Sequence, residues 1–98
     1  MFLKVIVDYL GYIKGLLGVT QPEGIELKND AQIRDLLIVL AKRHGATFTT
    51  NLFAPNEADL KGNIILTVNG LLLNQLKGIE SKLKDGDHVI FMPIVSGG

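Results

Sequence analysis

Apolar and polar residues alternate in two segments near the beginning of the chain. Residues 2–8 are rich in β-branched and aromatic side chains, a composition typical of a strand, which we expect to run as far as Ile13. Residues 24–28 alternate apolar and polar side chains, which predicts a second, half-buried strand. Gly15 and Gly18 indicate a turn or loop between them. We therefore expect an antiparallel hairpin with a long connection.

A helical period follows this hairpin. Apolar residues recur with spacings of three and four, which predicts one buried stripe on a helix, at Ile33, Leu36, Leu37 and Leu40. Asn29 or Asp30 is the expected N-cap, and Gln32 completes a capping box if Asn29 is the cap. Three cationic or imidazole side chains at 42–44 are favourable at the negative, C-terminal end of the helix dipole. Gly45 is expected to end the helix in the left-handed conformation.

The second half of the chain is predominantly strand. Residues 63–68 contain a nearly continuous apolar run, which predicts a strand buried on both faces. Asn69-Gly70 predicts a tight hairpin turn into a short strand at 71–74. Asp85-Gly86-Asp87 predicts another turn before a last strand at 88–94. Residues 46–61 are mixed, with a turn at Pro55-Asn56 and a short helix expected at 56–60.

These elements predict an α+β fold in which one main helix packs on one face of a mixed sheet. The first and last strands are both strongly apolar, so their burial is best if they pair at the centre of the sheet. This arrangement is a β-grasp (ubiquitin-like) roll. We expect residues 1–94 to form one domain and residues 95–98 to form a flexible Gly-Gly tail.

Composition narrows the range of functions. Ten Lys and Arg balance ten Asp and Glu, so the electrostatic attraction on which nucleic-acid binding depends is largely missing. The absence of cysteine removes disulfides, thiolate metal sites and thiol nucleophiles. Residues 2–19 carry Lys4, Asp8 and Lys14, which fits neither a signal peptide nor a membrane span. We expect a cytoplasmic protein that holds no metal ion and binds neither nucleic acid nor membrane.

The candidates for catalysis are weak. Asp87 and His88 are adjacent on a predicted strand and so point to opposite faces, which argues against a catalytic dyad. Asp85 and Asp87 are more typical of a turn than of a carboxylate pair. His44 suits a helix end better than a ligand set. We therefore predict no catalytic residues in this chain.

The end of the chain, Val95-Ser96-Gly97-Gly98, carries the clearest chemical signal. Two glycines without Cβ atoms make a thin, conformationally free segment that can thread a narrow channel. Such a segment can present the carboxylate of Gly98 to another protein's active site. A carboxylate becomes reactive toward nucleophiles once its oxygen is made a leaving group, for which transfer of an adenylyl group from ATP is the obvious route.

The C-terminal third resembles the MoaD/ThiS family of ubiquitin-like sulfur carriers. The matching features are Val68-Asn69, the Asp85-Gly86-Asp87 turn, the apolar strand ending at Pro93 and the terminal Gly-Gly. The ending Phe-x-Pro-x-Val-Ser-Gly-Gly is closer to MoaD, the small subunit of molybdopterin synthase, than to ThiS. Family members often carry an Arg-containing stretch after the first strand, where this chain has Tyr-Ile-Lys-Gly-Leu at 12–16.

The resemblance implies a sulfur carrier that acts with other proteins. A MoeB/ThiF-type activating enzyme would use ATP to adenylate the carboxylate of Gly98, and a persulfide sulfur donor protein would convert the adenylate to a thiocarboxylate. Gly97, Ser96 and Val95 would thread into the partner, and the molybdopterin synthase large subunit would supply the catalytic groups. The carrier itself would bind no cofactor permanently.

Alternation along the last strand indicates a docking surface. If Val89 and Phe91 face the helix, Ile90 and Met92 face away from it, beside the tail. We expect Ile90, Met92 and Pro93 to form a partner-binding patch, with Pro93 ending the strand because it lacks a backbone N–H. The alternative is that all the apolar residues of this strand belong to the core.

Other functions remain open. The chain could be a ubiquitin-like modifier joined through Gly98 to lysines of target proteins, or a carrier for tRNA thiolation or thiazole synthesis. It could also be an interaction module whose terminal glycines are incidental. Deleting Gly97 and Gly98 separates this last reading from the others.

Overall fold

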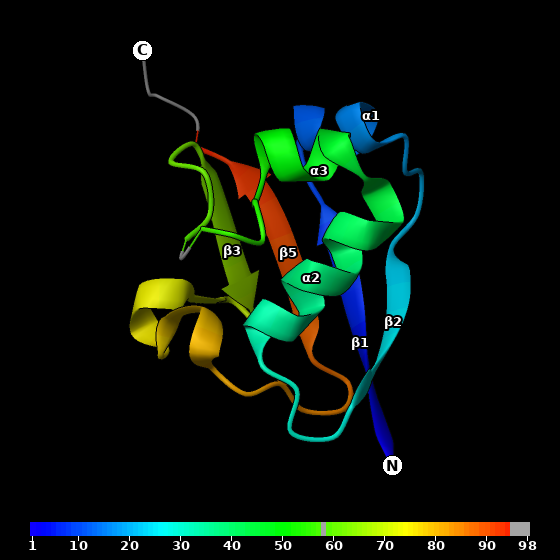
Figure 1. The fold of residues 1–98 in the computed structure, drawn as a ribbon, viewed down its shortest axis with the longest axis vertical. Helices are drawn as coiled ribbons and strands as arrows, with labels where there is room; N and C mark the ends of the chain where they lie inside the picture. Colours follow the sequence, from blue (N-terminus) through cyan, green and yellow to red (C-terminus); the bar gives the residue numbers. More distant parts are fainter. Residues whose placement is uncertain (58, 95–98) are drawn as a thin grey trace.

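The computed structural model describes residues 1–57 and 59–94, and its centre is a mixed five-stranded sheet with strand order β2-β1-β5-β3-β4 (Figure 1). The strands are β1 (Phe2–Tyr9), β2 (Glu23–Lys28), β3 (Ile64–Val68), β4 (Leu71–Leu72) and β5 (His88–Pro93). The α-helices are α1 (Tyr12–Leu17), α2 (Ile33–His44) and α3 (Ala46–Asn51), and two 3-10 turns are η1 (Leu73–Gln75) and η2 (Gly78–Glu80).

The first and last strands lie side by side at the centre of the sheet, as predicted. β1 and β5 are parallel, with Val7 opposite Val89, and β3 pairs antiparallel with the other side of β5. The central strands carry the most continuous apolar sequences, so this order removes the largest apolar area from water. The predicted α+β, β-grasp fold is confirmed.

α2 covers one face of the sheet and buries the predicted stripe (Figure 1). Ile33, Leu36, Leu37 and Leu40 are all fully buried. The predicted cap is wrong, because the helix begins after Gln32, whose backbone N–H donates to Asp35 Oδ2 at 2.8 Å. Asp30 instead adopts a positive φ of 70° in the preceding turn.

The expected extension of the first strand to Ile13 is also wrong. β1 ends at Tyr9, and Gly11 turns the chain with a φ of 62° into α1. Ile13 is the buried residue of this short helix, and Gly18 ends it in the left-handed conformation. Ile13, Leu16 and Leu17 have helical spacing, but six residues are too short a window to establish a period, and Gly15 and Gly18 indicated a turn instead, which is why the pattern did not predict α1.

Residues 46–61 also differ from the expectation. A helix forms at Ala46–Asn51, and the described residues 52–57 and 59–63 contain none, so the helix expected at 56–60 is not found there. Gly45 has a φ of 69° and both ends α2 and begins α3. α3 and the residues after it bury Phe48, Leu52 and Phe53 completely.

The predicted Asn69-Gly70 turn is confirmed, since both residues have positive φ. The strand after it is shorter than expected, because the chain leaves Leu71–Leu72 for a 3-10 turn at Leu73.

Candidate functional site

The end of β5 is held by both of its neighbours. On one side, Leu10 N–H donates to Phe91 O at 2.9 Å, and on the other Ile94 N–H donates to Asn63 O at 2.9 Å. The strand lies between β1 and β3, so its direction is set on both sides. The chain is therefore delivered to residue 94 at a fixed position. The predicted carrier residues Val95, Ser96, Gly97 and Gly98 lie outside the described residues.

The side chains of β5 alternate as predicted. Val89 and Phe91 are completely buried beneath the helices, whereas Ile90 and Met92 are half-buried on the opposite face. We call this opposite face the open face. The alternative that every apolar residue of β5 is core therefore does not hold.

Pairing shows which residues accompany Ile90 and Met92. Directly opposite residues in a sheet share a face. Asp8 and Thr67 therefore flank Ile90, and Ile65 lies beside Met92. Ile6 is on the same face of β1. The open face thus carries an apolar band of half-buried side chains, which are Ile6, Ile65, Ile90 and Met92.

Ile6 and Ile65 were not predicted as members of this band from the sequence. Alternation along β1 places Ile6 on the face opposite Val5 and Val7, which are completely buried. This alternation was a sufficient sequence signal for Ile6. Ile65 lies in the run Ile-Ile-Leu-Thr-Val, where no alternation distinguishes the two faces.

Pro93 lies apart from Ile90 and Met92. It is opposite the buried Ile64, on the side of the sheet that carries α1 and α2. A Cβ atom on Gly11 would lie 3.0 Å from Pro93 Cγ, so Pro93 packs closely against the start of α1. Pairing with β3 also continues one residue beyond Pro93, through the N–H of Ile94. Pro93 therefore anchors the end of β5 on the helix side of the sheet.

Exposed apolar side chains surround the point where β5 ends. Leu10, Tyr12 and Ile94 are 43%, 53% and 51% exposed. Asn63 Nδ2 donates to Tyr12 Oη at 2.9 Å, while the Asn63 carbonyl accepts from Ile94. The segment that departs from the family pattern at 12–16 thus lies at the end of β5, within reach of any partner that takes the C-terminus.

We expect Gly11→Ala to destabilise the fold by about 1–3 kcal/mol, because an L side chain at this φ is strained and would also meet Pro93. Gly15→Ala is the matched control, since Gly15 lies within α1 and has nothing within 4 Å of an added Cβ. That control should be neutral or stabilising by about 0.5–1 kcal/mol. Urea unfolding of both variants tests this, and equal effects would contradict the packing role of Gly11.

The residues of the other motifs have structural roles. Asn69 Nδ2 donates to Asp87 Oδ1 at 2.8 Å, and Asn69 Oδ1 accepts from His88 N–H at 2.9 Å. Asp87 Oδ2 accepts from Lys84 N–H, and Asp85 Oδ1 accepts from Lys4 N–H, both at 2.8 Å. The Val-Asn and Asp-Gly-Asp turns are therefore tied to each other and hold the beginning of β5.

A partly buried polar cluster joins β1, β2 and the end of α2. Glu23 Oε1 accepts from Tyr9 Oη at 2.9 Å and lies 3.0 Å from His44 Nε2, and Glu23 Oε2 is 3.2 Å from Arg43. Burial, followed by the Glu23 charge, raises the pKa of Tyr9 well above its ordinary range. Burial alone would raise the pKa of Glu23, but hydrogen bonds from His44, Tyr9 and Arg43 outweigh it and lower the pKa. His44 thus packs against Tyr9 and Phe48 and binds Glu23.

This cluster predicts a pH-dependent contribution to stability. Because the folded-state pKa of Glu23 is lowered, the stabilisation is fully present above the ordinary value of 4.5 and is lost as pH falls through the lowered pKa. We expect Glu23→Gln to destabilise the protein by about 1–3 kcal/mol at neutral pH. Chemical denaturation across pH should show this difference shrinking in acid. Glu80→Gln, at an exposed site, should leave the profile unchanged; a constant difference for Glu23→Gln would contradict the role of the charge.

Within residues 1–57 and 59–94, no three His, Asp or Glu side chains are placed to hold a metal ion together. No helix in this part of the chain has the length and apolar character required to cross a membrane.

Comparison with known proteins places the chain in a family. The family model described as "ThiS family" matches residues 7–98. The chain belongs to the ThiS family. ThiS-family proteins, which include the ubiquitin-like sulfur carriers and modifiers, are small proteins that act with partner enzymes. The resemblance noted from the C-terminal motifs is therefore confirmed.

Solved structures agree with this assignment. A Pyrococcus furiosus protein provisionally named molybdopterin converting factor, subunit 1, is 34% identical, with a TM-score of 0.74 over 95% of this chain and 99% of that one. Small archaeal modifier protein 1 from Methanosarcina acetivorans is 25% identical, with a TM-score of 0.73 over 100% of this chain and 99% of that one.

A chain of the Amycolatopsis orientalis BexX/CysO complex shares the fold at 24% identity, with a TM-score of 0.72 over 96% of this chain and 99% of that one. No curated protein matches this chain significantly.

Proposed function

We propose that this ThiS-family protein carries sulfur as a thiocarboxylate on Gly98 and donates it in molybdopterin (molybdenum cofactor) synthesis, as the small subunit of molybdopterin synthase. The observation that carries the proposal is the family match through residue 98, which includes the terminal Gly-Gly. The 34% identity to a relative provisionally named molybdopterin converting factor, subunit 1, supports this pathway over the others.

The chemistry takes place on partners, and this chain supplies the reacting carboxylate. In the active site of a MoeB/ThiF-type enzyme, a carboxylate oxygen of Gly98 attacks the α-phosphorus of ATP, and pyrophosphate leaves. The terminal sulfur of a persulfide donor protein then displaces AMP from the acyl carbon. Cleavage of the resulting S–S bond by a thiol leaves the thiocarboxylate. Val95, Ser96 and Gly97 thread through the channel, and this chain provides no catalytic residue.

The open face is the surface on which we propose that the activating enzyme and the synthase large subunit dock. Its band of Ile6, Ile65, Ile90 and Met92 is half-buried in the free protein and lies beside the end of β5. Further burial of these side chains would favour association, and the flexible thioether of Met92 adapts to more than one partner. We propose that this chain and both partners act in the cytoplasm.

Intact mass measurement of the C-terminal peptide, from protein purified out of its native source, tests the function directly. A sulfur in place of one oxygen on Gly98 is the expected result. A free carboxylate together with lysine-linked adducts of the chain would contradict the carrier role.

Protein modification is the second candidate function. The 25% identity to small archaeal modifier protein 1, over the full length of this chain, favours it. Modification requires the same adenylation of Gly98, so only the product distinguishes the two. An isopeptide bond between Gly98 and a lysine Nζ of another protein, found by mass spectrometry, would establish it.

A further inference from the structure

The sheet has one long free edge. Its two outer strands in the described part of the chain are β2, with six residues, and β4, with two. A free edge presents unpaired N–H and C=O groups, which can pair with a strand from another chain. β2 is therefore the edge long enough to accept such a strand.

Register shows which backbone groups of β2 are free. Asn29 N–H donates to Met1 O, so the hydrogen-bonded pairs with β1 fall at the odd-numbered residues, including Leu27 opposite Leu3. The N–H and C=O groups of Gly24, Glu26 and Lys28 then point away from the sheet. Among the described residues, the only backbone bond to these groups is from Ala31 N–H to Lys28 O, which leaves that oxygen a second lone pair.

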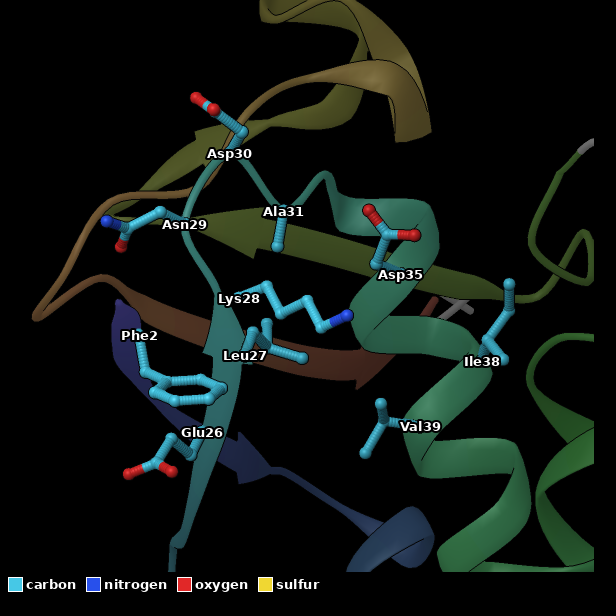
Figure 2. A pocket seen from close by; sticks show the side chains of 10 residues that line it. All are labelled: Phe2, Glu26, Leu27, Lys28, Asn29, Asp30, Ala31, Asp35, Ile38 and Val39. Atoms are coloured by element: carbon cyan, nitrogen blue, oxygen red, sulfur yellow. The ribbon is translucent and has the colours of Figure 1, made fainter.

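A groove runs along this edge between β2 and α2 (Figure 2). Its volume is about 520 Å³, and its apolar lining includes Leu27, Ile38 and Val39. Phe2 also lines it and is 63% exposed. Alternation along β2 places Glu26 and Lys28 on the same face, opposite the buried Leu27. In Figure 2 the Glu26 side chain points away from α2, whereas the long Lys28 side chain extends toward α2 and has to turn to the face of Glu26 to pair across a strand. The groove thus combines apolar surface with an ordered row of backbone groups and two opposite charges.

The charges of Glu26 and Lys28 indicate which strand can pair with the free edge of β2. When two copies of β2 pair antiparallel about Leu27, Glu26 of each copy lies opposite Lys28 of the other. This register gives two cross-strand pairs of opposite charge and four backbone hydrogen bonds. Pairing about Glu26 would instead place two carboxylates directly opposite, which is destabilising. The sequence Glu-Leu-Lys at 26–28 is therefore complementary to itself in this register.

We propose that the β2 edge is a self-association site at which a second copy of this chain pairs antiparallel, with Glu26 opposite Lys28 of the partner copy. The two sheets become one continuous ten-stranded sheet, with both copies of α2 on the same side. Phe2 and Val39 of each copy become less exposed at the joined grooves. The open faces and the ends of β5 stay free, so self-association and docking of an activating enzyme are compatible.

One strand pair buries a small area, so we expect a weak dimer. Sedimentation velocity on the full chain, from about ten micromolar to about one millimolar, should show a reversible shift from monomer to dimer. Monomer throughout this range would overturn the proposal.

Charge reversal tests the register. Glu26→Lys or Lys28→Glu should each weaken dimerisation by about tenfold, because each places like charges opposite one another. The double variant Glu26→Lys/Lys28→Glu restores opposite charges and should recover association to within about threefold of the wild type. Lys14→Glu, an exposed reversal on α1, is the control and should have no effect. Single reversals without effect, or a double variant that stays weak, would overturn the register.

Hydrogen exchange of the unmodified protein gives a test that needs no variant. At high protein concentration the amides of Glu26 and Lys28 should become protected, whereas that of Gly24 should not, because it lies opposite the turn residue Asp30 of the other copy. Protection of Gly24 together with Glu26 would indicate pairing about Glu26 and contradict the proposal. Concentration-dependent protection confined to β5 or β3 would place the contact on the open face and also contradict it.

Discussion

Removal of Gly97 and Gly98 is expected to abolish thiocarboxylate formation while leaving the unfolding temperature unchanged. The reacting carbonyl of the proposed carrier is that of Gly98, and truncation places a serine carboxylate two residues short of the activating enzyme's nucleotide. The core of the fold, in contrast, consists of side chains between Leu3 and Phe91, so the truncation removes none of it.

The measurement pairs two readouts on the same truncated protein. Adenylation is followed as pyrophosphate release with the activating enzyme, and stability is followed by thermal unfolding. Gly98→Ala is a useful companion, because it keeps the length and adds only a Cβ at the position that must enter a narrow site. A large fall in unfolding temperature on truncation would show that the terminal residues support the fold. Unchanged pyrophosphate release would contradict the role of Gly98.

Charge on the open face should produce the second largest effect. We expect Met92→Asp to weaken binding of the activating enzyme by about 10- to 100-fold, since a carboxylate would be desolvated within the apolar band, beside Ile65. Leu71→Asp is the matched control, because Leu71 is an exposed apolar residue of the same sheet that pairs with Val68 on the helix side. That control should change binding by less than about twofold.

Titration calorimetry with the activating enzyme measures both variants, and thermal unfolding confirms that each is folded. A loss of binding confined to Leu71→Asp would move the docking surface to the helix side of the sheet. Equal losses for the two variants would show that charge at any exposed apolar position is harmful, and would remove the argument for the open face.

Local pattern was a reliable guide where one physical cause dominated. The stripe from Ile33 to Leu40 has the period of a helix and is buried accordingly. The Asn69-Gly70 turn requires positive φ at both positions, and the structure has it. The two faces of β5 follow from alternation alone, so Ile90 and Met92 were placed correctly.

The pattern failed where contacts between distant segments set the outcome. α1 has only six residues, too few to establish a period, and it forms because Ile13 reaches the core while Gly11 packs on Pro93. The sequence did not show that Pro93 faces the opposite side of the sheet from Ile90 and Met92, because this depends on what lies on each side of β5. Glu23 and His44 are 21 residues apart, and only folding brings them within 3.0 Å.

The sequence by itself determined the fold class and the central pairing of the first and last strands, and it predicted the chemistry that we propose for the Gly-Gly terminus. These follow from periodicity, from turn residues and from a covalent end group, all of which are local properties. Tertiary structure decided which apolar side chains accompany Ile90 and Met92, how the end of β5 is held and which edge of the sheet is free. Those properties depend on strand order and register. Strand order and register are set when apolar segments far apart in the chain are buried against one another.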